Sequence, residues 1–138
     1  MGVTVLIDRI NKAQMAVREM PQPEFVTNHY FGNGWYAREL LLEAGTFAIG
    51  KMHKKEHLFM ITKGALQIAK EDGAEIIRAP AMMVASPGTK RAVLALEDTV
   101  CIAIHCTENT DLDVIEEELI EDDTLALFDA HNKLKAPS

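Results

Sequence analysis

The sequence is poor in cysteine, in long apolar runs and in concentrated positive charge, and each shortage excludes a class of protein. Only two of its 138 residues are cysteines, Cys101 and Cys106. They lie in one apolar, extended segment at a separation that places their side chains on opposite faces, so we expect no disulfide between them. Free thiols are typical of a reducing compartment, and we therefore expect a cytoplasmic protein.

Membrane spans and nucleic-acid-binding surfaces are also missing from the sequence. No apolar run approaches the roughly 20 residues that a membrane-spanning helix needs. The net charge is −7, and nine of the 21 acidic residues lie between Glu108 and Asp123, where no Lys or Arg occurs. The rest of the chain is close to neutral and has no basic face, so we expect neither a membrane nor a nucleic acid as partner. The acidic run is typical of a solvated helix face.

Helical patterns are confined to the two ends of the chain. In residues 1–24, apolar residues recur at spacings of three and four, which predicts a helix capped by Thr4 and a linker after it. In residues 108–138 we expect an acidic helical tail, with Thr110 capping its first helix and a second short helix at 124–134.

Residues 25–107, between these ends, show the pattern of short strands. Apolar runs alternate with turn signals at intervals of roughly eight to twelve residues, which is typical of a sandwich or barrel. Asp72-Gly73 predicts a tight hairpin. No strand alternates with a long helix, so a parallel α/β sheet is disfavoured. We therefore expect residues 1–138 to form a single all-β domain, an antiparallel barrel of about eight strands with helices at its ends.

Two of the five histidines, His53 and His57, are close enough in sequence to act together. In a straight strand, residues four apart are separated by about 13 Å, too far to share a ligand. They converge only if the chain turns between them, and the polar residues from Lys54 to Glu56 suit a turn. We expect His53 to end one strand and His57 to begin the next, with both rings facing one cavity.

The segment around these histidines resembles the first sequence motif of the cupins, which runs from a glycine through two alternating histidines and a glutamate to a second glycine. Here the motif spans residues 50–64. His53 falls at its second histidine, His57 at the place of its glutamate and Lys51 at the place of its first histidine. The resemblance implies a cupin-type jelly-roll barrel, a fold that commonly holds a ligand or a metal.

A second cupin motif is recognisable at residues 86–91, where Arg91 takes the position of the third metal-binding histidine. The whole resemblance covers about residues 36–105. Four short segments resemble small cupin-like proteins of tailed bacteriophages: Tyr36–Glu39, Ala44–Thr46, His53–Leu58 and Gly88–Arg91. This resemblance implies an accessory or virion-associated protein of a bacteriophage, located in the cytoplasm of a bacterial host.

Departures from the motif favour an anion pocket over a metal site. Cupin enzymes typically bind iron, manganese, nickel or zinc through three histidines and a glutamate. A catalytic metal is usually coordinated by about three protein ligands. Lys51 and Arg91 would direct two positive charges at the cation. A polar rim of Lys51, His53, His57 and Arg91 suits a small anion, because arginine holds a carboxylate or phosphate through two hydrogen bonds. The alternative is that Lys51 and Arg91 extend into solvent and His53 bonds to the backbone.

Two functions follow from these residues. We favour a non-enzymatic cupin module that binds a small anion, carries little metal and assembles as a homodimer or larger oligomer through apolar strands that include Met60 and Met82–Met83. The alternative is a metal-dependent enzyme, isomerase-like or oxygenase-like, in which His53, Glu56 and His57 hold a divalent transition metal.

The remaining histidines have no motif position. Glu56, His29 and His105 are alternative candidates for a third metal ligand, but the two histidines lie in strand-edge or tail contexts. We therefore expect them to be structural, like His131.

Overall fold

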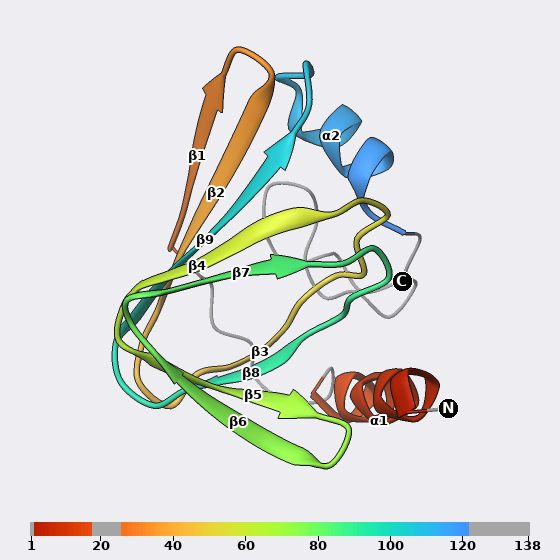
Figure 1. The fold of residues 1–138 in the computed structure, drawn as a ribbon, viewed down its shortest axis with the longest axis vertical. Coiled ribbons are helices and arrows are strands. Elements are labelled where there is room, and N and C mark those ends of the chain that lie inside the picture. The colour runs from red at the N-terminus through yellow and green to blue at the C-terminus, as the bar shows by residue number, and fades with distance from the viewer. Residues whose placement is uncertain (1, 18–25, 122–138) are drawn as a thin grey trace.

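The structure of the protein is a computed structural model, which describes residues 2–17 and 26–121. Its strands form two antiparallel sheets that face each other, with one helix before them and one after them (Figure 1). The predicted helix at 124–134 lies outside the described residues. In chain order the elements are α1 (Gly2–Val17), β1 (Val26–Gly32), β2 (Trp35–Leu42), β3 (Phe47–Ile49), β4 (His57–Lys63), β5 (Ala65–Lys70), β6 (Gly73–Arg78), β7 (Ala81–Ala85), β8 (Ala92–Ala95), β9 (Thr99–Cys106) and α2 (Leu112–Leu119).

The two sheets enclose the apolar core. One sheet has five strands in the order β1-β2-β9-β4-β7, and the other has four in the order β3-β8-β5-β6. The predicted all-β barrel is confirmed, with nine strands in the described residues rather than about eight. Neither described helix is long and apolar enough to cross a bilayer. The buried residues of the main core cluster come from both sheets: Leu42, Phe59, Ile61, Leu66, Ile68, Val93, Ala95 and Cys101.

Local turn chemistry explains the clearest strand boundaries. The predicted hairpin at Asp72-Gly73 is confirmed, since it joins β5 and β6 and pairs Lys70 with Gly73. Gly73 has a φ of +142°, a conformation that residues with a Cβ rarely adopt. Cys101 and Cys106 are both free, as expected, and only Cys101 is buried.

Helix α1 packs against the barrel through a buried lysine. Lys90 is 7% exposed, and its Nζ donates to Asn11 Oδ1 and Gln14 Oε1 of α1, each at 2.7 Å. These bonds satisfy an ammonium that would be costly to bury alone. The helix begins at Gly2, so the prediction of Thr4 as its cap is wrong. Capping residues locate a helix end only to within a residue or two.

Helix α2 closes one end of the five-stranded sheet. Its cap is Asp111, whose carboxylate accepts hydrogen bonds from the backbone N–H groups two and three residues further on, at 2.9 and 3.3 Å. The prediction of Thr110 as the cap is therefore wrong by one residue. Ile115 and Leu119 are buried and pack with Tyr36 of β2 in a second apolar cluster. The helix is thus held over the inner face of the sheet by the apolar stripe that its sequence predicts.

Candidate metal centre

One row of side chains crosses the inner face of the five-stranded sheet where β2, β9 and β4 lie side by side. β2 pairs Tyr36 with His105 of β9. β9 pairs Ile104 with Leu58 of β4, so His57 lies in the same row as His105. Directly paired residues of antiparallel strands point to the same face. The row therefore places Tyr36, His105 and His57 next to one another on three strands.

The loop before β4 adds His53 to this row. The chain bends at Lys54 and Lys55, as the polar stretch predicts. His53 lies outside the named strands, in an isolated bridge with Ile120, so it does not end a regular strand as expected. Its ring centroid lies 4.1 Å from that of His57 and 5.1 Å from that of His105. The turn between the two motif histidines thus brings them into contact.

His53, His57 and His105 form a compact, buried group. Each offers one ring nitrogen, and these three atoms lie within 4.8 Å of one another. The three residues are 7%, 5% and 4% exposed. Within the described residues, both ring nitrogens of His53 and the Nδ1 of His57 have no hydrogen-bond partner. A buried polar atom without a partner costs about 1–3 kcal/mol, so the group has ligand atoms that something else must satisfy.

All three imidazoles are held in the neutral form. Burial lowers the pKa of His53 to about 2, that of His57 to about 4 and that of His105 to about 3, each from an ordinary value of 6.5. The neighbouring imidazoles lower the pKa of His53 further, and so do the arginines Arg38 and Arg91. A metal binds the neutral form of imidazole, so no proton has to leave these rings first.

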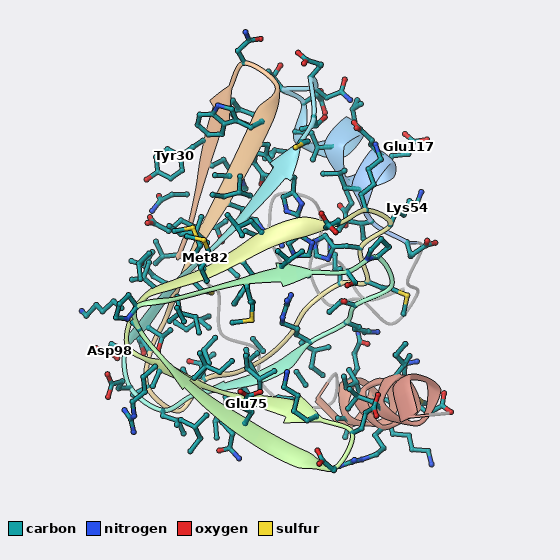
Figure 2. All side chains as sticks on the ribbon, viewed as in Figure 1. Tyr30, Lys54, Glu75, Met82, Asp98 and Glu117 are labelled. Atoms are coloured by element: carbon teal, nitrogen blue, oxygen red, sulfur yellow. The ribbon has the colours of Figure 1, made fainter. Side chains whose placement is uncertain are left out.

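The helix α2 covers this group and leaves a small cavity beside it. The cavity has a volume of about 20 Å³, enough for one water-sized group. Lys54 Nζ donates to the backbone oxygen of Glu117 at 2.9 Å and so ties the loop to α2. Figure 2 labels both residues. The cavity is lined by Tyr36, Arg38, His53, His105, Leu112, Ile115, Glu116, Leu119 and Ile120.

The two cations that the motif places at the site, Lys51 and Arg91, have different partners in the structure. Lys51 forms an ion pair with Glu116 of α2, so its charge is compensated within the protein. Lys55 pairs with Glu118 at 3.2 Å, so this part of the acidic run is docked on the barrel rather than simply solvated. Arg91 lies over the ring of Phe59, with its Cζ 4.6 Å from the ring centroid.

The structure assigns other residues to the site than the sequence did. His105 was expected to be structural, yet β9 brings it into the group. His105 lies four residues after Cys101 in one apolar run, so both side chains point to the same face of the strand. Because Cys101 is buried, this spacing was a signal that His105 faces the interior. Glu56, expected as a ligand, is exposed and lies outside the group. His29 hydrogen-bonds to Tyr36 through Nδ1 and the phenol oxygen at 2.7 Å, also outside it.

This donor set fits a divalent transition metal. Imidazole suits zinc, copper, iron and nickel, and three protein ligands leave a position open for a further ligand. The unpartnered ring nitrogens and the neutral rings agree with that use. Part of the expected obstacle to a cation is removed, because Lys51 is paired with Glu116. His105 supplies a third imidazole, while Arg38 and Arg91 still place positive charge beside the rings.

Comparisons with known proteins show likeness at the level of the fold. No family model and no curated protein matches the chain. A salicylate 1,2-dioxygenase of Pseudoaminobacter salicylatoxidans with gentisate has a TM-score of 0.56 and 13% identity over 82% of this chain and 34% of that one. This chain therefore spans about a third of that dioxygenase.

Two shorter proteins give similar scores. A cupin-2 domain protein of Shewanella frigidimarina has a TM-score of 0.50 and 16% identity over 70% of this chain and 98% of that one. An acetylacetone dioxygenase of Acinetobacter johnsonii has a TM-score of 0.51 and 15% identity over 63% of this chain and 66% of that one. These likenesses, together with the two facing antiparallel sheets, establish that the chain has the cupin fold.

Proposed function

We propose that the protein binds one divalent transition metal through His53, His57 and His105. The observation that carries the proposal is the group of three buried histidines whose ligand atoms lie within 4.8 Å of one another. Burying three imidazoles, two of which have unpartnered nitrogens, costs stability unless a ligand satisfies them. A metal would be that ligand.

The surroundings of the three histidines support a site that holds its ligands in place. His57 and His105 project from adjacent strands, and His53 is tied by its backbone oxygen, which accepts from Gly88 N–H at 2.8 Å. Ile115 and Leu119 of α2 exclude water from one side. Ligands on a rigid scaffold need little rearrangement, which favours tight binding.

When bound, a divalent metal supplies a Lewis acid that polarises an oxygen atom of a further ligand at the open position. The chain's own residues would shield that position under α2 and keep the three imidazoles neutral. Two neighbours in fold are a salicylate and an acetylacetone dioxygenase, which favours the oxygenase-like form of the enzyme alternative. A non-enzymatic accessory or virion-associated role in a bacteriophage stays a prediction from the sequence resemblance.

Metal uptake tests the proposal directly. The protein is stripped with a chelator, reloaded separately with iron(II), manganese, nickel and zinc, and analysed for metal by elemental analysis. We expect about one equivalent per chain for at least one metal. His53→Ala and His105→Ala should lose it, whereas the control His29→Ala, on the same sheet but outside the group, should keep it.

Two results would contradict the metal site. One is that no metal exceeds about a tenth of an equivalent in a folded parent protein. The other is that His105→Ala retains as much metal as the parent, which would show that the metal is held elsewhere.

A further inference from the structure

Two arginines, Arg38 and Arg91, lie beside the histidine group. Within residues 2–17 and 26–121, neither Arg38 nor Arg91 takes part in an ion pair. The Nε of Arg38 is buried and has no hydrogen-bond partner among the described residues. Arg38 also lines the cavity beside His53 and His105. A half-buried guanidinium with an unused donor is costly unless an anion accepts its hydrogen bonds.

The sheet register places Arg38 and Phe59, the ring that Arg91 covers, on either side of the small residue Ala103. β2 pairs Arg38 with Ala103 of β9, and β9 pairs Ala103 with Phe59 of β4. Arg91 lies over the ring of Phe59. The three paired residues therefore form a second row on the inner face, next to the row that carries His105 and His57. Ala103 fills little space between the two guanidinium groups.

A buried thiol supports this convergence of the two arginines. Cys101 lies two residues before Ala103 on β9, in the next row of the same face. Burial raises the pKa of Cys101 to about 11, while Arg38 and Arg91 both act to lower it. Both positive charges are thus close enough to affect one atom from opposite sides of β9. They place positive charge beside the histidine group in a protein with a net charge of −7.

We propose that Arg38 and Arg91 form a binding site for the carboxylate of a small organic acid, held over Ala103 beside the three histidines. A carboxylate is planar and accepts two parallel hydrogen bonds from a guanidinium. Lys51, which the sequence placed in an anion pocket, belongs instead to the ion pair with Glu116. This site goes beyond the proposed metal centre, because the arginines need an anion whether or not a metal is bound.

Carboxylate binding is measured on the chelator-treated, metal-free full chain. Malonate, acetate and inorganic phosphate are compared by thermal shift and by isothermal titration calorimetry. A ligand that binds only the folded protein raises its melting temperature in proportion to ln(1 + [L]/Kd). We expect malonate to stabilise the parent more than phosphate does, and to bind Arg38→Gln at least about tenfold more weakly.

Matched variants separate this site from general charge effects. Arg38→Lys should recover part of the affinity, since lysine keeps the charge but loses the planar pair of donors. Arg78→Gln is the control: Arg78 is an exposed arginine of β6, 3.8 Å from Glu97, on the other sheet, and its loss should change nothing. If Arg38→Gln fails to fold, Arg91→Gln should show the same loss of malonate binding.

The dependence of malonate binding on the two arginines decides whether this site exists. Malonate binding that is lost with Arg38 or Arg91 and kept without Arg78 supports the site. The site is overturned if no carboxylate shifts the melting temperature, if phosphate binds more tightly than every carboxylate, or if neither Arg38→Gln nor Arg91→Gln weakens binding. Metal uptake without carboxylate binding would refute this site alone, and carboxylate binding without metal uptake would refute the metal centre alone.

Discussion

Lys51 and Glu116 form an ion pair between the loop that carries His53 and the helix α2. Their side chains are 10% and 28% exposed, so the pair is largely shielded from water. The lysine that occupies a histidine place of the cupin motif is therefore neutralised by the acidic segment that follows the barrel. This ion pair therefore both compensates the charge of Lys51 and holds α2 over the three histidines.

Glu116→Gln is expected to weaken both stability and metal binding. The substitution leaves Lys51 charged and without this partner near the three histidines, where a positive charge opposes a cation. We expect a loss of about 1–3 kcal/mol in the free energy of unfolding, the usual cost of losing a hydrogen bond to a charged group, and a lower metal affinity. Urea unfolding and competition with a chelator measure the two effects.

Glu117→Gln is the matched control for this prediction. Glu117 is the next residue of α2, its side chain is exposed, and its backbone oxygen makes the contact with Lys54. A neutral glutamine there should leave both measurements unchanged. Equal effects of the two variants would mean that α2 responds to overall charge rather than to the pair with Lys51.

The metal-free protein is expected to lose stability as the pH falls below about 6.5. The three imidazoles have folded pKa values of about 2, 4 and 3, below the ordinary value of 6.5. Between these limits the unfolded chain binds protons that the folded chain does not, so acid favours unfolding. The stabilisation is complete above pH 6.5 and is lost as the pH falls towards the folded values. From pH 7 to pH 5 we expect a loss of roughly 1–2 kcal/mol per imidazole.

Denaturant unfolding at several pH values, with a chelator present, measures this dependence. His57→Gln removes one of the titrating groups, so its unfolding free energy should fall less steeply with acid than that of the parent. Identical slopes for the two proteins would show that His57 does not resist protonation in the folded state.

The outer face of the five-stranded sheet is expected to pair two copies of the chain. Met82 and Val84 of β7 are 63% and 64% exposed, and Tyr30 of β1 is 49% exposed. Figure 2 shows Tyr30 and Met82 on the outward side of this sheet. Met60 pairs with Met82 on the same face, whereas Met83 packs against the core and is not available for an interface. We therefore propose that the homodimer expected from the sequence forms here.

Light scattering at micromolar concentration tests the dimer. The double variant Met82→Glu, Val84→Lys should be monomeric, because it places charges in the centre of the apolar face. Ile76→Lys is the control, since Ile76 is 56% exposed but lies on β6 of the other sheet. A monomeric parent, or a dimer that survives the double variant, would contradict the proposed interface.

The strand content, the hairpin at Asp72-Gly73 and the approach of His53 to His57 follow from the sequence alone. These features depend on local chemistry: a two-residue alternation, a turn that needs glycine, and a polar bend between two histidines. Helix ends were less well determined, because Thr110 and Asp111 are both good caps and the folded geometry selects Asp111.

The other groups that join the two motif histidines depend on the folded arrangement of the strands. His105 lies 48 residues after His57 and becomes its neighbour through the pairing of β4 with β9, and Arg38 enters through the pairing of β9 with β2. Glu116 reaches Lys51 because the apolar stripe of α2 packs on Tyr36. No local spacing encodes these contacts, since strand order in a sheet depends on how the whole core packs. The sequence therefore determined the fold, two of the three histidines and Arg91, and the tertiary structure added His105, Arg38 and the helix that covers them.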